Sequence, residues 1–82
     1  MADNRMILAH KHTGYGVFLG KRHDMRWFAA LAVDARIEQL FDKVASLGEG
    51  DPDDYVLLQE TDESWDYAGE EGEWLIKVGF RK

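Results

Sequence analysis

The segment from Asp62 to Glu73 has the residue types of a cation-binding loop. Counted from Asp62, carboxylates or a hydroxyl fall at positions 1, 3, 5, 9 and 12, which is the ligand spacing of an EF-hand calcium loop. Position 6, however, is Tyr67, where that loop needs glycine for its sharp turn. The flanking residues have strand patterns and not helical ones. We therefore expect no specific calcium site, and an acidic loop that faces solvent or a partner.

Three histidines could supply metal ligands. His10 and His12 would share a face on a strand, and His23 would have to join them across a hairpin. Zinc usually has three or four protein ligands, and the chain has no cysteine to complete a site. The pattern favours solvated surface histidines over a metal centre. We expect neither a metal nor another cofactor.

No residue pattern indicates a catalytic site. Ser46 and Ser64 do not lie in the strained turn that presents a catalytic serine. Neighbouring carboxylates occur in polar segments, with little apolar surrounding to raise a pKa. The glycine-rich residues 14–20 match neither common phosphate-binding fingerprint, so a hairpin is the simpler interpretation. We expect a protein that is not an enzyme.

Charge is distributed unevenly along the chain. Between Val44 and Ile76 there are eleven acidic residues and no lysine or arginine, whereas the remainder is mildly basic. One side of the folded molecule should therefore be strongly negative, and such a field attracts basic partners and repels nucleic acid. We expect a basic protein to bind the acidic side chains, with two aromatic anchors among them. The residues predicted to contact this partner are Asp62, Glu63, Trp65, Asp66, Tyr67, Glu70 and Glu71.

A second interpretation uses basic residues instead. Lys21, Arg22 and Arg26 follow the glycine-rich segment and could hold the phosphate of a small ligand, such as a nucleotide, in a monomer or an oligomer. Direct binding to duplex DNA is not expected at a formal net charge of −6. Salt-sensitive capture of one protein would favour the first interpretation, and thermal stabilisation by a nucleotide would favour the second.

The elements that position these residues are those of a small α+β domain. A chain of 82 residues is one domain. Residues 20–24 are expected to form a turn, and 61–72 a long polar loop. A strand over residues 25–31 is favoured over an early helix start. Alternating apolar patterns predict the other strands at 5–12, 15–19, 55–60 and 74–80. The order ββ(β)αββ predicts a small antiparallel sheet with one helix packed on one face.

A single helix is predicted over residues 34–47. Asp34 is a good N-cap residue, and Gly48 is typical of a helix C-terminus. A bulge is expected at Gly16 in the second strand. Apolar residues at helical spacing form one stripe, and we expect this stripe to be buried against the sheet. Its members include Ile37, Leu40, Phe41 and Val44.

The residues from His10 to Arg22, with Trp27 after them, resemble small accessory proteins encoded by bacteriophages. The resemblance implies the cytoplasm of a bacterial host and a role in host takeover or anti-defence. It implies no catalytic residues. Some such proteins resemble nucleic acid by offering carboxylates where a target expects phosphates. The expected partner is then a bacterial protein with a basic surface. The lack of cysteine and of a long apolar run agrees with a reducing compartment and no membrane partner.

Overall fold

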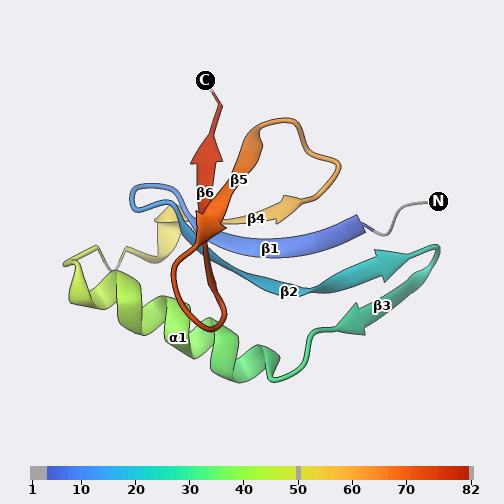
Figure 1. Cartoon of the computed structure of the whole chain (residues 1–82), viewed down its shortest axis with the longest axis horizontal. Helices are drawn as coiled ribbons and strands as arrows, with labels where there is room; N and C mark the ends of the chain where they lie inside the picture. The colour runs from blue at the N-terminus through green and yellow to red at the C-terminus, as the bar shows by residue number, and fades with distance from the viewer. Residues whose placement is uncertain (1–3, 50, 82) are drawn as a thin grey trace.

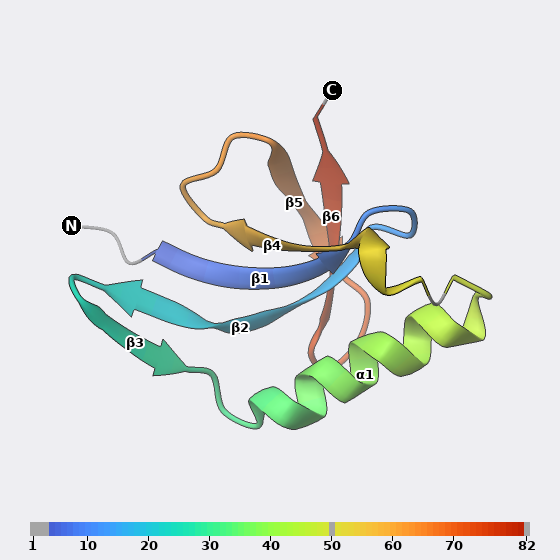
Figure 2. The same cartoon turned by 180° about the vertical axis from the view of Figure 1, so that it is seen from behind.

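The computed structural model of the chain describes residues 4–49 and 51–81. Within these residues six strands form a single antiparallel sheet, and one α-helix packs against one of its faces (Figures 1 and 2). This arrangement confirms the predicted α+β class. None of the described residues belongs to a helix that is long and apolar enough to cross a membrane. The elements are β1 (Asn4–His10), β2 (Tyr15–His23), β3 (Arg26–Ala29), α1 (Val33–Ser46), a short 3-10 helix η1 (Pro52–Asp54), β4 (Tyr55–Gln59), β5 (Trp65–Glu70) and β6 (Leu75–Phe80).

Strand β2 has two partners along the same edge. The sheet order is β4-β1-β2-β6-β5, and β3 pairs with β2 outside this path. Residues 15–17 of β2 pair with β6, and residues 20–23 pair with β3. The other edge of β2 pairs with β1 along most of its length. The second half of β2 and β3 therefore form a two-stranded arm, residues 20–29, which projects away from β5 and β6 (Figure 1).

The change of partner coincides with a β-bulge at Leu19 and Gly20, which interrupts the regular register of β2 and which we call the break. The register of β1 against β2 shifts between Met6 and Ile7, opposite Leu19, so the irregularity lies here and not at the predicted Gly16. Gly20 has a φ of +151°, and a Cβ at this position would lie 2.3 Å from the carbonyl oxygen of Phe28. Only glycine therefore allows β3 to approach β2 this closely.

The sheet buries apolar side chains on both faces. On one face Val17 and Leu75 pack against Leu40 and Val44 of α1. On the other face, which we call the open face, a second cluster is bordered by partly buried aromatic rings such as Trp65. The members of that cluster are Ile7, Ala9, Leu58, Ile76 and Val78. Strands β5 and β6 cross the direction of β1 steeply, so the sheet curves around this second cluster (Figures 1 and 2).

The two ends of α1 differ in how well they agree with the prediction from the sequence. Gly48 follows the helix with a φ of +77° and donates its N–H to Ala45, which confirms the predicted glycine at the C-terminus. At the other end the N-cap is Ala32, with no side-chain cap, so the prediction of Asp34 is wrong. Asp34 lies in the first turn, where its negative charge interacts favourably with the positive end of the helix dipole and stabilises the helix.

The predicted apolar stripe of α1 is only partly buried. Leu40 and Val44 have no exposed surface, as expected, and Ile37 is half-buried. Phe41 is 46% exposed, so the prediction that it lies under the sheet is wrong. Its ring packs edge-on against Tyr55, with the centroids 5.0 Å apart, at the border between the helix and β4. The stripe is therefore narrower than the sequence spacing indicates.

Two polar segments that were predicted as loops are strands. The expected turn at 20–24 is shortened to two residues, Asp24 and Met25, because β2 continues to His23. The expected loop at 61–72 contains all of β5. Both segments expose most of their side chains, so polar residues are compatible with them. Their backbone groups are satisfied by pairing with a neighbouring strand, which hydropathy does not report.

Leu40 and Phe41 are neighbours in α1 but differ in burial, so replacing each by alanine should lower the free energy of unfolding by different amounts. Leu40→Ala should lower the free energy of unfolding by about 2–5 kcal/mol because it leaves a cavity in a closed cluster. Phe41→Ala should cost about 1 kcal/mol, since nearly half of its surface is already in water. Urea denaturation of both variants measures the difference. Equal costs for the two variants would mean that α1 presents another face to the sheet.

Candidate functional site

The predicted partner-binding residues lie on one hairpin. We call residues 62–74, which comprise β5 and the turns on either side of it, the acidic hairpin. Asp62 precedes β5, and its carboxylate accepts the backbone N–H of Ser64 at 2.9 Å. This hydrogen bond, with that of the Ser64 hydroxyl, lowers the pKa of Asp62. Asp62 therefore fixes the turn that leads into β5.

Asp66 is the member of this set that is neutralised by a cation. Arg81 donates to it through two guanidinium nitrogens, with Nε 2.8 Å from Oδ2. The hydrogen bonds from Arg81 hold the pKa of Asp66 below its usual range and raise that of Arg81. The pair joins β5 to the residue that follows β6, so it holds the acidic hairpin together. Asp66 is less available than its neighbours to an incoming basic group.

The two predicted aromatic anchors differ in exposure. Trp65 is half-buried at the border of the open-face cluster, and its indole Nε1 donates to the carbonyl of Gln59 at 2.9 Å. This contact ties the start of β5 to the end of β4. Tyr67, two residues further, is 51% exposed. Tyr67 is therefore the ring that a partner can cover without rearrangement of the fold.

A register shift in β5 determines where Glu70 lies. Tyr67 pairs with Val78, whereas Glu70 pairs with Ile76, so the extra residue lies between Tyr67 and Gly69. Val78 and Ile76 both belong to the open-face cluster. Glu70 therefore lies on the same face as Tyr67, beside the open face. Without the shift, the alternation of side chains would place it on the opposite face.

Three further carboxylates project from the turns of the acidic hairpin. Glu63, Glu71 and Glu73 are exposed, and within the described residues none of them has an ion pair or a side-chain hydrogen bond. Glu71 takes part in the turn only through its backbone N–H, which donates to the carbonyl of Leu75 at 2.9 Å. The acidic hairpin thus presents free negative charge on both sides of Tyr67.

The structure separates the three basic residues of the alternative interpretation. Lys21 lies opposite Arg5 on β1 and opposite Phe28 on β3, on the open face. Arg26 pairs with His23 near the end of the arm, on the same face as Lys21. Arg22 points to the other face, as alternation along β2 requires. These three residues therefore do not form one site.

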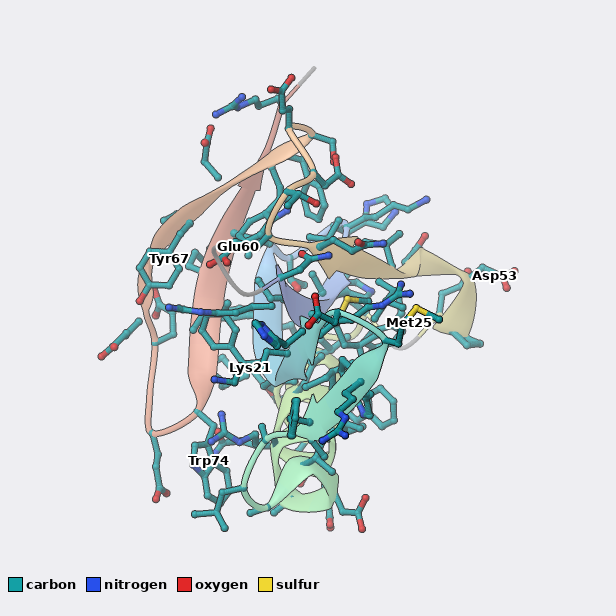
Figure 3. All side chains as sticks on the ribbon, turned by 90° about the vertical axis from the view of Figure 1, so that its right-hand side faces the viewer. Lys21, Met25, Asp53, Glu60, Tyr67 and Trp74 are labelled. Atoms are coloured by element: carbon teal, nitrogen blue, oxygen red, sulfur yellow. The ribbon has the colours of Figure 1, made fainter. Side chains whose placement is uncertain are left out.

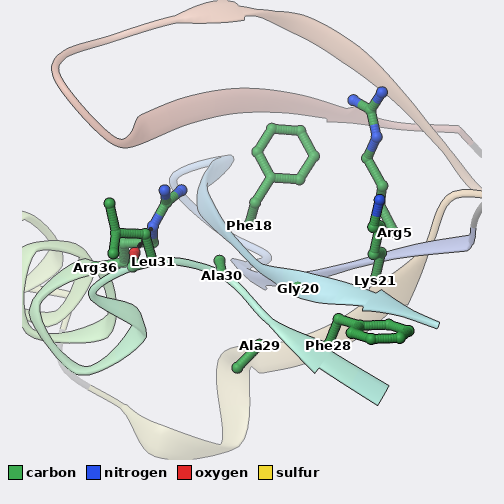
Figure 4. Close-up of a pocket in the computed structure, with 9 residues that line it drawn as sticks. All are labelled: Arg5, Phe18, Gly20, Lys21, Phe28, Ala29, Ala30, Leu31 and Arg36. Atoms are coloured by element: carbon green, nitrogen blue, oxygen red, sulfur yellow. Dashed lines mark hydrogen bonds between the residues drawn. The ribbon is translucent and has the colours of Figure 1, made fainter. Parts of the chain in front are cut away.

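A cavity on the open face instead joins Lys21 to residues that the sequence did not indicate. It has a volume of about 320 Å³, and Figure 4 shows Phe18 standing between Arg36 on one side and the pair of Arg5 and Lys21 on the other. Phe28 of β3 also lines it. Arg5, Ile7 and Ala9 are every second residue of β1 and so share a face, on which Ile7 and Ala9 are buried. This spacing is the one sequence signal that could have placed Arg5 here.

A second cavity adjoins the first across Arg5 and Phe18. Its volume is about 270 Å³, and its other lining residues come from β5 and from the end of β4. They include Glu60, Tyr67 and Glu70. In side view Tyr67, Glu60 and Lys21 lie along the same side of the molecule (Figure 3). The two cavities share Arg5 and Phe18, and we call them together the groove, with cations among the lining residues towards the arm and carboxylates towards the acidic hairpin.

Two of the groove's cations are held in place by several contacts. Arg5 forms an ion pair with Glu60, with Nε 3.4 Å from the carboxylate oxygen, and its guanidinium carbon lies 5.8 Å from the centroid of Phe18. Arg36 donates from Nε to the carbonyl of Leu31 at 2.7 Å and lies over the ring of Trp74. Both side chains are therefore pre-positioned beside the groove.

The arm exposes large apolar side chains. Met25 is 91% exposed, and Leu31, just beyond β3, is 85% exposed. Trp27 and Phe28 are also about half exposed, on opposite faces of β3. Aromatic and methionine side chains are enriched in interfaces. Only Phe28 and Leu31 of these residues line the groove.

The histidines do not form a metal centre in the described residues, where no three histidine or acidic side chains come together in a metal-binding group. His10 is fully buried, so the prediction of a solvated residue is wrong for it. Its Nδ1 accepts the N–H of Thr13 and its ring packs against Tyr55. His12 lies in the following turn, exposed, 3.3 Å from a carboxylate oxygen of Asp54. The calcium-like spacing after Asp62 is also not assembled, because β5 is extended.

In comparisons with protein-family models, curated proteins and solved structures, nothing matches this chain. The chemistry of the described surfaces is therefore the basis on which a function can be proposed.

Titration of Asp66 tests the contact that holds the acidic hairpin. Because its pKa is lowered in the folded state, its contribution to stability is present above its unfolded pKa and is lost as the pH falls through the folded value. Arg81→Gln should raise the pKa of Asp66 towards its ordinary range, as measured by NMR of the carboxyl carbon. Asp62 is the internal control, since Ser64 and not Arg81 lowers its pKa. An unchanged pKa of Asp66 would show that this pair does not form.

Proposed function

We propose that this chain is a non-enzymatic interaction protein that binds a basic protein surface through the acidic hairpin. The observation that carries the proposal is an exposed aromatic ring on β5 with free carboxylates in the turns before and after that strand. Glu63, Glu71 and Glu73 are without ionic partners among the described residues, and Tyr67 is half exposed between them. Aromatic residues at the centre of an interface, with charge at the rim, are the usual arrangement of a binding hot spot.

The rigidity of the acidic hairpin supports the same function. The contacts of Asp66 with Arg81 and of Trp65 with Gln59 fix the start of β5, and its pairing with β6 holds the rest of the strand. A preformed surface loses less conformational entropy on binding than a mobile acidic loop would. The free carboxylates can then attract a basic partner at long range, while Tyr67 contributes contact area after docking.

The chemistry of such a partner is that of a protein that normally binds phosphate groups. Carboxylates on a fixed hairpin offer negative charge to lysine and arginine side chains that would otherwise contact a nucleic acid backbone. Together with the resemblance to phage accessory proteins, this supports an inhibitor that occupies a bacterial nucleic-acid-binding protein, in host takeover or anti-defence. The expected mode is competitive: bound inhibitor and bound nucleic acid exclude each other.

Neutralising the free carboxylates tests the proposal. In a pull-down from bacterial lysate, wild-type protein should retain a basic host protein, and retention should fall as salt rises. The triple variant Glu63→Gln, Glu71→Gln, Glu73→Gln should bind that protein at least about tenfold more weakly, mainly through slower association. Surface plasmon resonance with the captured protein gives both rate constants.

The exposed outer face of α1 offers a matched control. Asp34, Glu38 and Asp42 repeat every fourth residue there, so replacing them by Asn, Gln and Asn removes the same number of charges elsewhere. The control variant should bind nearly as well as wild type. If both triple variants weaken binding equally, net charge and not the acidic hairpin is responsible, and the proposed site is wrong.

A further inference from the structure

The groove on the open face is independent of the free carboxylates used above and has the chemistry of a small-ligand site. Its cationic part is lined by Arg5, Lys21 and Arg36, which come from β1, β2 and α1, and the lining residues include no carboxylate. Arg5 pairs with Glu60 of the second cavity through Nε, and this exposed ion pair leaves the other N–H groups of its guanidinium available to an anion. Its volume of about 320 Å³ lies at the lower end of the range for ligand pockets.

We propose that this groove binds a nucleoside phosphate, with the phosphate at the cationic end. Arg5 and Arg36 are already oriented by Phe18, Trp74 and the carbonyl of Leu31, so little side-chain freedom is lost when a phosphate arrives. A guanidinium matches two phosphate oxygens at once, and Lys21 lies on the same side of Phe18 as Arg5, where it adds a further donor, while Arg36 lies on the other side of the ring. The inference concerns a second region, which shares the ring of Tyr67 with the surface proposed above, and goes beyond the function proposed for the acidic hairpin.

Aromatic rings account for the nucleoside part of the ligand. Phe18 stands in the middle of the groove and is shared by both cavities (Figure 4). Phe28 lines the cationic end, and Tyr67 lines the other. Every nucleobase has a π-face that stacks on such rings, whichever base it is. A bare inorganic anion would leave these rings unused.

The acidic end of the groove fits the hydrogen-bond donors of a nucleoside. Glu60 and Glu70 line the second cavity, and carboxylates only accept hydrogen bonds. Sugar hydroxyls and exocyclic amino groups are donors, so they suit this end, whereas a phosphate is repelled from it. The polarity of the groove therefore fixes the ligand's direction: phosphate towards the arm, and nucleoside towards β5.

Adjacent cross-strand pairs of the arm provide the variants and their matched controls. Lys21 and Phe28 pair with each other on the open face, and Arg22 and Trp27 form the next pair, on the opposite face. Lys21→Gln and Phe28→Leu therefore alter the groove, while Arg22→Gln and Trp27→Leu make the same chemical changes outside it. All four side chains are exposed, so the variants should fold.

The experiment is a titration of the full chain with adenosine 5′-monophosphate, followed in ¹H–¹⁵N NMR spectra. Backbone signals around Phe18 and Tyr67 should shift, and Lys21→Gln should weaken binding about tenfold. Phe28→Leu should weaken it about fivefold. The two control variants should change the affinity less than twofold. Adenosine should bind at least about tenfold more weakly than its monophosphate.

Three results would overturn the proposal. These are the absence of any shift at millimolar nucleotide, an equal loss of affinity in Lys21→Gln and Arg22→Gln, and equal affinities for adenosine and its monophosphate.

A single-stranded deoxyadenosine oligomer identifies the source of the ligand. Tighter binding of the oligomer, sensitive to Lys21→Gln, assigns the groove to a nucleic acid strand. Equal or tighter binding of the monophosphate assigns it to a free nucleotide. Whichever of these two results is obtained should also be obtained in the triple variant of Glu63, Glu71 and Glu73. Binding in the groove can then be told apart from binding at the free carboxylates.

Discussion

The break in β2 at Leu19 and Gly20 is the constraint on which both proposed surfaces depend. Before the break β2 pairs with β6, and after it the same edge pairs with β3. Because β2 changes partner, the acidic hairpin and the arm diverge, and the groove lies between them with Phe18 at its centre. Gly20 makes the divergence possible, since a side chain there would meet the backbone of β3.

This arrangement keeps opposite charges apart in a small molecule. The acidic hairpin contributes carboxylates without cationic partners among the described residues, while the arm and α1 contribute Lys21 and Arg36 at the other end of the groove. Where the two regions meet, Arg5 and Glu60 form an ion pair. Exposed pairs of this kind add little stability, so their positions affect recognition more than folding. The polarised surface is consistent with two adjoining binding regions that share Tyr67.

The sequence predicted the elements with strong local patterns. The alternation of Ile76, Val78 and Phe80 correctly placed the last strand, and the spacing of Leu40 and Val44 correctly gave the buried side of α1. It also indicated β3, since a strand over residues 25–31 was favoured over a helix there. It failed at β5 and at the second half of β2, where both strand faces are exposed and backbone pairing leaves no hydropathy signal. The sequence could also not bring Arg36 and Lys21 to the same cavity. Their common position at this cavity depends on the break in β2 and on the path of the chain from β3 into α1.

The candidate residues were anticipated in type more than in arrangement. The acidic composition of residues 62–73 was plain, but the shift that brings Glu70 beside Tyr67 follows from an extra residue in β5. Likewise Lys21 and Arg22 are neighbours in sequence, yet they face opposite sides because strand alternation separates them. Long-range contacts such as Trp65 with Gln59 fix these positions, and no local pattern encodes them.

Amide hydrogen exchange in Gly20→Ala tests most directly whether the break in β2 holds the arm against the sheet. The N–H of Ala30 donates to the carbonyl of Leu19 at 2.9 Å, whereas that of Val78 donates to Gly14 at 2.7 Å, on the other side of the break. A methyl group at position 20 should displace β3 and release the Ala30 amide to fast exchange, with Val78 still protected. If Ala30 remains as protected as in the wild type, Gly20 does not control the divergence of β3 and β6, and this account of the groove is wrong.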